Sequence, residues 1–222
     1  MVRKTNIKNS LAALSVLLGF GVIIYVFLPI ASYLSLARIK YPNLISPIAE
    51  NEFYENNAED VDLTKASNWF SERGFFDLST SKIRYYNLTI EDLKINNALV
   101  VIGGEDLSKN LIHYPGSSYP GKNGNSVIFG HSVLPSFFDP NDYLTIFSTL
   151  PTIDKGAEII VNFDGMQYKY VVEAIFEVTP RDVEIFEQNI SNSYLTLVTC
   201  TPPGDPRKPK RLIVRARLVP FS

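Results

Sequence analysis

The sequence predicts a mainly β domain, a closed or partly closed barrel of about seven to eight strands with short helices, preceded by one transmembrane helix. Leu11 to Ala37 is a run of 27 residues without a charge, and about 20 mainly apolar residues suffice for a helix to cross a bilayer. From about Lys82 onward, short apolar runs are separated by turn residues, without the alternation of strands and helices that builds a parallel sheet.

The N-terminus is expected to be a retained signal anchor. Residues 1–10 carry three basic and no acidic side chains, and residues 11–37 form the predicted span. A cleaved signal peptide is the alternative, but its apolar region would be about 7–15 residues long and would end at an A-x-A-like site. Basic residues before the span favour a cytoplasmic N-terminus and an extracytoplasmic domain, although Arg38 and Lys40 weaken this bias. We therefore expect a single-pass protein of the cell membrane.

Charge and cysteine content narrow the function classes. All 23 acidic residues follow Ala37, together with 18 of the 21 basic ones, so this part has a net charge of −5. Such a balance argues against nucleic acid as a partner. Cys200 is the single cysteine, so no internal disulfide can form, and a free thiol results. No cluster of metal ligands is evident in the sequence, and we expect neither a metal nor another cofactor.

Residues 38–81 are predicted to be a stem or linker. The segment is rich in asparagine and acidic residues and has no sustained period. Within it, "DLTKASNWFSERG" predicts a short amphipathic helix with Leu63, Ala66 and Phe70 on one side, ending near Gly74. This helix either packs on the domain or only spaces it from the membrane.

Residues 82–222 are predicted to form the folded domain. Runs rich in Val, Ile, Tyr and Phe favour strands: "IRYYNLTI", "NALVVIGG", "GNSVIFGH", "AEIIVNF", "MQYKYVVEAIFEV", "SYLTLVTC" and "KRLIVRARLV". Between them, "NDYLTIFSTL" predicts a short helix capped by Asn141 or Asp142, and "PRDVEIFEQN" predicts a helical turn.

A cysteine and two residues that could assist its chemistry lie at the ends of predicted strands. Cys200 closes the run "YLTLVT", and His131 follows "NSVIFG". A thiolate needs a neighbouring imidazole or cation, and Arg211 begins the last run as a permanent cation. Taken one at a time, these residues also fit an inert buried cysteine, a packing histidine and a solvated strand face.

Longer motifs resemble those of the sortases, membrane-anchored cysteine transpeptidases. "TLVTC" resembles their active-site signature, "LIHYPGSSYPGKNGNSVIFGHS" the segment that leads to the catalytic histidine, and "TCTPPGDPRKPKRLIVRARL" the segment from nucleophile to arginine. The similarity covers about Ile83 to Leu218, and a class D- or E-like member is one option. It implies a sortase-like barrel in which Cys200 is the nucleophile, His131 the proton donor and acceptor, and Arg211 the stabiliser of the oxyanion and substrate.

The resemblance also implies a reaction and its partners. An LPXTG-like sorting signal near the C-terminus of a protein would be cleaved between Thr and Gly through a thioester. The acyl group would then pass to an amine of a cell-wall precursor or a pilin lysine. Thr199, His113 and Ser132 are expected to contribute to substrate binding, and Arg207 is a minor rival of Arg211. "SVLPSFFDPNDY" is either a wall of the substrate groove or a packed surface loop.

Two other functions stay open at this point. One is a membrane-tethered extracytoplasmic β-domain that binds a surface partner and holds an inert Cys200. The other is a cysteine protease, although the signatures "CGSCW" and "QACRG" are absent, as is the "HGC" typical of L,D-transpeptidases.

Overall fold

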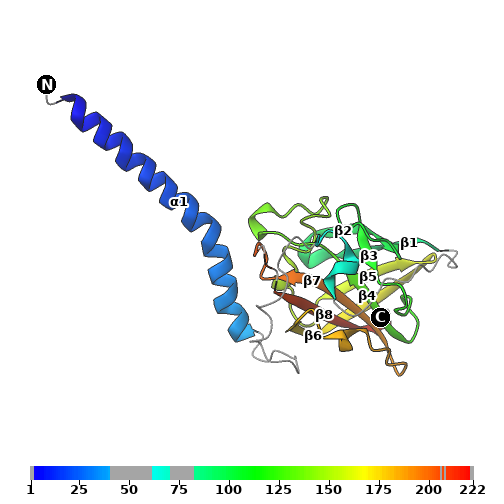
Figure 1. The fold of residues 1–222 in the computed structure, drawn as a ribbon. Helices are drawn as coiled ribbons and strands as arrows, with labels where there is room; N and C mark the ends of the chain where they lie inside the picture. The colour runs from blue at the N-terminus through cyan, green and yellow to red at the C-terminus, as the bar shows by residue number, and fades with distance from the viewer. Residues whose placement is uncertain (1–2, 41–61, 71–82, 206, 208, 221–222) are drawn as a thin grey trace.

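The computed structural model describes residues 3–40, 62–70, 83–205, 207 and 209–220. One long helix, α1 (Arg3–Lys40), lies beside a closed β-barrel (Figure 1). The eight strands are β1 (Tyr85–Ile90), β2 (Ile95–Ile102), β3 (Leu111–His113), β4 (Gly124–Phe129), β5 (Glu158–Phe163), β6 (Met166–Val178), β7 (Ser193–Thr201) and β8 (Lys210–Val219). The predicted fold class, a mainly β barrel with short helices, is confirmed.

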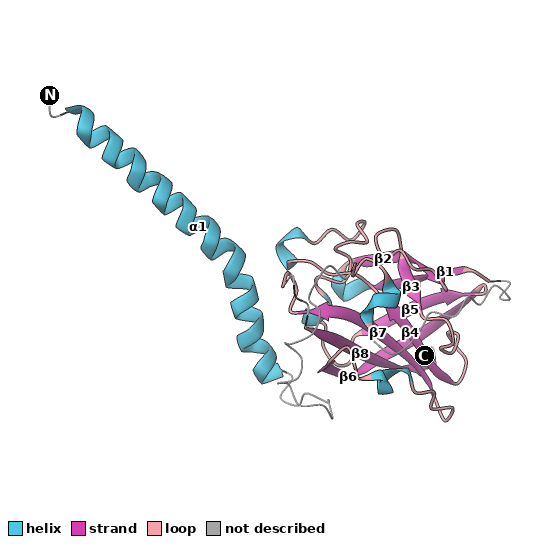
Figure 2. Ribbon diagram, viewed as in Figure 1, coloured by secondary structure: helices cyan, strands magenta, loops and turns pink. Residues whose placement is uncertain are grey.

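The strands follow the order β1-β2-β3-β4-β7-β8-β6-β5 around the barrel. Neighbouring strands pair antiparallel except for β2 with β3 and β4 with β7, which are parallel. The parallel pair of β4 and β7 ends both strands at the same rim of the barrel. Figure 2 shows the end of β7 on the side of the barrel nearest to α1.

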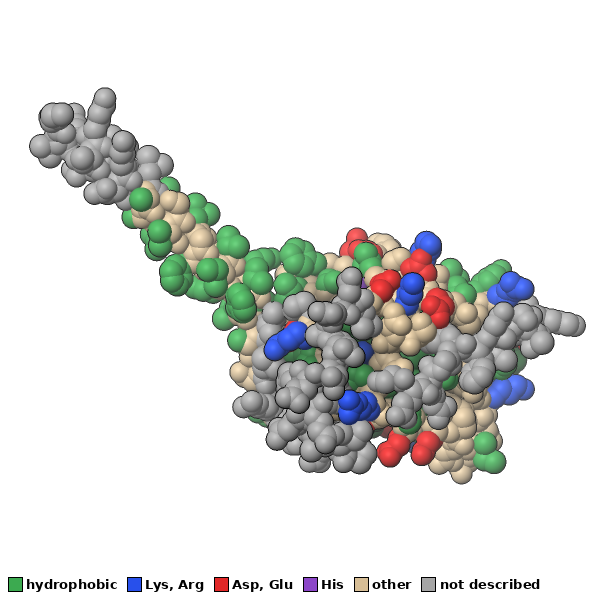
Figure 3. All heavy atoms as spheres, viewed as in Figure 1, with side chains coloured by type: hydrophobic (Ala, Val, Ile, Leu, Met, Phe, Trp, Pro, Cys, Tyr) green, Lys and Arg blue, Asp and Glu red, His purple; other side chains and the backbone are tan. Residues whose placement is uncertain are grey.

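Helix α1 contains a stretch, Ala12–Tyr33, that is long and apolar enough to cross a membrane by length and composition. Hydrophobic side chains are spread along the coloured part of this helix in Figure 3. The C-terminal end of α1 contacts the barrel, because Lys40 Nζ donates to the carbonyl oxygens of Pro151 (3.2 Å) and Ile153 (3.1 Å). Helix α1 extends to Lys40, beyond the uncharged run of residues 11–37.

Seven strands coincide with the runs that the sequence predicts, and β3 is the one that the sequence missed. Strand β3 has only three residues, and it lies at the start of "LIHYPG". Three residues are too few to show an alternating pattern. The strand forms because β2 and β4 flank it on both sides.

The prediction of a short helix over "NDYLTIFSTL" is wrong. The structure has turns here, followed by the short 3-10 helix η5 (Leu150–Thr152). Thr145 N donates to Asp142 O and Ser148 N to Thr145 O, both at 2.9 Å, which is the i→i+3 pattern of turns. The Asp142 carboxylate also accepts from Leu144 N at 2.9 Å, so the expected cap closes a local turn instead of starting an α-helix.

The other short helices are also of the 3-10 type. They are η2 (Ala66–Trp69), η3 (Glu91–Leu93), η4 (Pro135–Phe137) and η6 (Val183–Phe186). The turn η6 confirms the helical turn predicted over "PRDVEIFEQN". In the predicted amphipathic helix only η2 is found, and its expected end at Gly74 lies outside the described residues.

Two hydrophobic clusters lie on the two faces of the barrel wall. The inner core fills the barrel and takes residues from all eight strands: Leu88, Val100, Leu111, Ile128, Ile159, Tyr170, Leu197 and Val214 among others. The outer cluster covers the outside of β3, β4, β7 and β8: Trp69, Phe70, Ile112, Tyr114, Phe129, Phe186, Val198, Cys200 and Ile213 among others. Neighbours in sequence such as Leu197 and Val198 belong to different clusters, as the alternation of side chains in a strand requires.

Candidate active site

Cys200 and Arg211 face each other across β7 and β8. Their Cα atoms are partners in the antiparallel ladder, one rung before its end. Cys200 lies two residues after Val198 on β7, and Arg211 lies two residues before Ile213 on β8, so each shares a face with that neighbour. Val198, Cys200 and Ile213 belong to the outer cluster. The thiol and the guanidinium therefore project from the same outer face of the barrel.

His131 reaches the same rim from β4. The parallel ladder of β4 and β7 pairs Phe129 with Val198, and Gly130 N donates to Val198 O at 3.1 Å. The chain continues beyond the end of β4 alongside β7, because Thr199 Oγ1 donates to Gly130 O and Ser132 Oγ donates to Cys200 O, so His131 lies at the rim next to the Cys200 end of β7. The topology of the barrel thus brings together the three residues that the sequence analysis assigns to the chemistry.

The packing around Gly130 requires a residue without a side chain directly before His131. A Cβ atom at Gly130 would lie 2.2 Å from Cδ2 of Phe147, far closer than atoms can approach. Phe147 N in turn donates to His131 O at 3.0 Å. Packing against the glycine and this hydrogen bond fix the backbone at His131.

Two of the predicted substrate-binding residues lie at this rim. Ser132 Oγ donates to the carbonyl oxygen of Cys200 at 2.9 Å. Thr199 Oγ1 donates to Gly130 O at 2.8 Å, but its side chain belongs to the inner face of β7 and is fully buried. Both hydroxyls therefore join β7 to the chain around His131, and that of Thr199 lies on the opposite face of β7 from the thiol.

His113, the third predicted substrate-binding residue, lies in the barrel interior. Its neighbour Ile112 belongs to the outer cluster, so the His113 side chain points to the opposite face from Cys200. Its Nδ1 lies 2.8 Å from Tyr86 Oη and its Nε2 3.1 Å from Ser117 Oγ. Burial lowers the pKa of His113 to about 4. The structure thus separates His113 from the site by the barrel wall.

Arg207 is engaged elsewhere. Its guanidinium donates to the Asp205 carboxylate through Nε at 3.1 Å and Nη2 at 2.8 Å, and its side chain is two-thirds exposed. The hydrogen bond from Arg207 lowers the pKa of the Asp205 carboxyl. This geometry favours Arg211 over Arg207 as the cation beside Cys200.

The site is covered in this conformation. Cys200, Arg211 and His131 are only 1%, 2% and 7% exposed. Arg211 Nη2 donates to the backbone carbonyl of Trp69 at 3.1 Å, and the guanidinium carbon lies 5.4 Å from the centre of the Trp69 ring. Phe70 lies on the same guanidinium at 6.0 Å. Residues 62–70, named the cover segment below, therefore pack against the guanidinium, and Trp69 and Phe70 belong with Cys200 to the outer cluster.

The cover segment is held by several contacts that sequence reasoning missed. Trp69 Nε1 donates to Leu63 O at 2.8 Å, and Ala66 N donates to Glu105 O at 3.1 Å. The ring of Phe70 packs edge-on against Phe186 at 5.1 Å. The apolar side predicted for this segment, with Leu63, Ala66 and Phe70, does pack on the outer cluster, but the sequence did not show that Trp69 and Phe70 would lie on Arg211.

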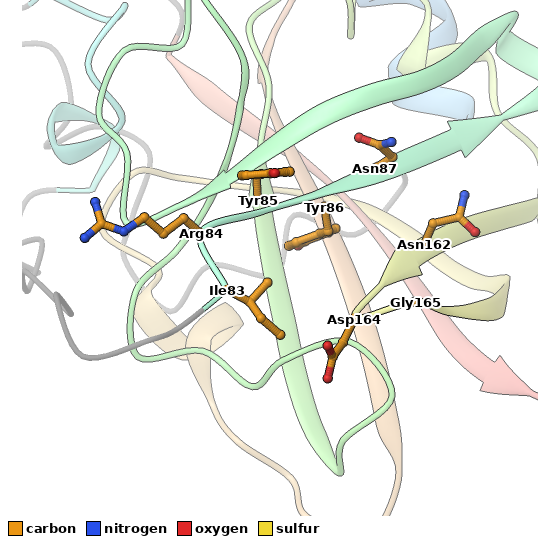
Figure 4. Close-up of a pocket in the computed structure, with 8 residues that line it drawn as sticks. All are labelled: Ile83, Arg84, Tyr85, Tyr86, Asn87, Asn162, Asp164 and Gly165. Atoms are coloured by element: carbon orange, nitrogen blue, oxygen red, sulfur yellow. The ribbon is translucent and has the colours of Figure 1, made fainter.

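The loop after His131, residues 132–143, combines surface and packed positions. Phe137 in η4 is 59% exposed, whereas Phe138 packs against the inner core. A separate hollow of about 370 Å³ lies where β1 begins and the β5–β6 turn passes. Figure 4 shows Ile83 and Tyr86 on one side of it and Asp164 on the other. Its lining includes none of Cys200, His131 and Arg211.

Comparison with known proteins agrees with this geometry. A family model described as a sortase domain matches residues 88–219. The chain is 30% identical over 132 residues to sortase A of Streptococcus agalactiae serotype III (strain NEM316), covering 59% of this chain and 51% of that protein. It is 28% identical over 136 residues to sortase D of Bacillus subtilis (strain 168), covering 59% of this chain and 62% of that protein.

A solved structure shows the same fold. The sortase D5 transpeptidase of Clostridium perfringens superposes with a TM-score of 0.53 at 26% sequence identity, over 62% of this chain and 79% of that one. The two curated relatives are matched over about half to three fifths of their own lengths.

Proposed function

Because the chain belongs to the sortase family, we propose that it is a cysteine transpeptidase that cleaves an LPXTG-like sorting signal between Thr and Gly. The observation that supports this most directly is the pairing of Cys200 with Arg211 on the outer face, with His131 just beyond the end of the adjoining strand β4. Its substrates would be proteins with such a signal near their C-terminus. The acceptor would be an amine of a cell-wall precursor or a pilin lysine.

In the proposed first step, the Cys200 thiolate attacks the Thr carbonyl carbon, and the carbonyl electrons move onto oxygen. Arg211 stabilises this oxyanion as a fixed cation and donor. Support comes from the bond that Arg211 already makes to a peptide carbonyl, that of Trp69. Protonated His131 gives its proton to the leaving Gly amine as the C–N bond breaks, which leaves an acyl thioester on Cys200.

In the second step, neutral His131 accepts a proton from the incoming amine as that amine attacks the thioester. The tetrahedral intermediate collapses, the C–S bond breaks and the Cys200 thiolate is restored. Water in place of the amine gives hydrolysis as a side reaction. The thiol is 1% exposed and the cover segment packs on Arg211 beside it, so a substrate would reach Cys200 only after this segment has moved away.

The test is cleavage of an LPXTG-like reporter peptide with and without an added amine. The Cys200→Ala variant should lose turnover and thioester capture entirely, since it lacks the nucleophile. His131→Ala should lower kcat by about 10²- to 10⁴-fold, the usual contribution of a proton-transfer group. His113→Ala is the matched control and should be far less damaging. Persistent turnover by Cys200→Ala, or the reverse ranking of the histidines, would refute the assignment.

The burial of Cys200 also favours a second candidate, a tethered binding domain with an inert thiol. Reaction of the folded protein with a thiol-specific reagent separates the two. A catalytic thiol should be modified at a measurable rate that depends on pH, whereas an inert one should react only on unfolding.

We further propose that Ala12–Tyr33 crosses the cell membrane once and that the barrel lies outside the cytoplasm. The length and composition of the stretch support the first statement, and the basic residues before it support the second.

A further inference from the structure

Glu177 is a buried carboxylate near the end of β6, and the proposed mechanism does not use it. It is 6% exposed, and its backbone pairs with Leu212, the residue after Arg211. The next residue, Val178, pairs with Arg211 itself. A charge is costly to bury unless it is paired or hydrogen bonded. The partners of this carboxylate therefore indicate which groups it holds in place.

Two partners come from the last rung of the β7–β8 ladder. Thr201 Oγ1 lies 3.2 Å from Glu177 Oε1 as donor, and Lys210 Nζ lies 3.6 Å from Glu177 Oε2. Thr201 and Lys210 are Cα partners of each other. They directly follow Cys200 and directly precede Arg211, so the carboxylate joins the rung next to the proposed catalytic pair.

The third partner comes from helix α1. Tyr33 Oη donates to Glu177 Oε1 at 2.7 Å, and the single hydroxyl proton of Thr201 is shared between Tyr33 Oη and Glu177 Oε1. The Tyr33 side chain packs against the inner core, and Tyr33 is the last residue of the stretch that can cross a membrane. In Figure 1 the lower part of α1 passes the side of the barrel where these strand ends lie.

We propose that Glu177 is a positioning residue that holds the ends of β7 and β8 together, and that Tyr33 completes this contact from the membrane anchor. The proposal rests on the proposed function, because it concerns the geometry of Cys200 and Arg211. The last rung of a ladder opens more readily than its middle, since it has neighbours on one side only. The Glu177 carboxylate opposes this opening because it binds both residues of that rung. Tyr33 of α1 binds the same carboxylate. Docking of α1 thereby raises the fraction of molecules with the thiol and guanidinium in register.

The chemistry of the contact predicts an order among variants. Glu177→Gln keeps an oxygen that accepts from Tyr33 and Thr201 but loses the charge that pairs with Lys210. Glu177→Ala loses all three contacts. Tyr33→Phe removes one donor and leaves the carboxylate bound to the barrel. The expected order of kcat is wild type, then Tyr33→Phe and Glu177→Gln, then Glu177→Ala.

The experiment uses the full chain in detergent micelles. Turnover of the LPXTG-like reporter and the pH profile of Cys200 alkylation by iodoacetamide are both measured. We expect Glu177→Ala to lower kcat by about 10- to 100-fold, the size of loss that small displacements of reacting groups produce, with KM nearly unchanged. The alkylation profile should shift in the same variant, and Tyr33→Phe should have no further effect once Glu177 is Ala.

The matched controls lie on the same elements. Glu173 is on the same strand and pairs with Arg217 of β8 at 3.3 Å, farther from the rim. Glu173→Gln should leave kcat and the alkylation profile unchanged, as should Tyr25→Phe, whose side chain is 59% exposed on α1. Thermal unfolding of each variant reports on stability separately.

Three results would overturn the proposal. One is an unchanged kcat and alkylation profile in a folded Glu177→Ala variant. Another is a Glu173→Gln variant that changes kcat and the alkylation profile as much as Glu177→Ala does. The third is that the Tyr33 and Glu177 substitutions lower kcat additively. Absence of reporter turnover in the wild type would refute the proposed function alone, because the alkylation profile of Cys200 needs no substrate and still decides whether Glu177 positions it.

Discussion

His113 pairs with Ile128 of β4, three residues before His131, yet the two histidines face different surroundings. His113 sits inside the barrel between Tyr86 and Ser117, with its ring stacked on Tyr119 at 5.7 Å. His131 lies at the rim beside Cys200. Burial keeps His113 neutral at ordinary pH, so its imidazole acts as a packed polar group.

At the residue scale, the lowered pKa of His113 predicts a loss of stability in acid. The folded state binds the proton only near pH 4, whereas the unfolded chain binds it near 6.5. Lowering the pH through this window therefore favours unfolding, by about 2 kcal/mol between pH 7.5 and 5.0. Urea unfolding of the wild type and of His113→Gln at both pH values measures this change in the free energy of unfolding. The wild type should lose about 2 kcal/mol more than the variant, and equal losses would contradict the assignment.

At the scale of elements, the cover segment connects the stem to the chemistry. Trp69 packs edge-on against Phe129 of β4 at 5.5 Å while its carbonyl accepts from Arg211 of β8. One short segment thus spans two of the strands that carry site residues. We expect its displacement to release the guanidinium and to expose the thiol beside it.

The corresponding prediction concerns Trp69→Ala. Loss of the indole weakens the cover segment and increases the open fraction, and the reactivity of Cys200 should rise in proportion. We expect modification of Cys200 by a thiol reagent to accelerate by about tenfold or more. Circular dichroism must show that the variant is folded, since Trp→Ala in a core costs about 3–5 kcal/mol.

Phe137→Ala is the matched control for this prediction. Phe137 is an exposed aromatic in the loop after His131 and is absent from the outer cluster. Its replacement should leave the modification rate unchanged. If Trp69→Ala and Phe137→Ala react at the same rate as wild type, the cover segment does not control access to Cys200.

At the scale of the whole molecule, the helix and the barrel meet at the rim that carries the site. Tyr33 contacts β6 and β7, and Lys40 contacts the segment around η5. If Ala12–Tyr33 crosses the membrane as proposed, Cys200 works close to the outer surface of the bilayer. Tyrosine is enriched at that depth because its ring is apolar and its hydroxyl polar.

The proposed topology is testable with single-cysteine variants in a Cys200→Ala background. Lys122 is exposed on the barrel, so Lys122→Cys should react with a membrane-impermeant maleimide on intact cells. Asn6→Cys, before the apolar stretch, should react only after the membrane is permeabilised. Labelling of Asn6→Cys on intact cells, or release of the protein from the membrane fraction by high salt, would contradict a single crossing with an outer barrel.

Local patterns in the sequence determined the apolar helix, seven of the eight strands and the residues that meet at the rim. Strand propensity and alternation are carried by neighbouring residues, and the motifs around His131, Cys200 and Arg211 are continuous. Tertiary structure alone decided the three-residue strand β3, the turns in place of a helix after Asp142, and the inward direction of His113 and Thr199. It also decided the cover by Trp69 and the contact of Glu177 with Tyr33. Each of these depends on groups far apart in the chain, whose contacts exist only once the barrel has closed.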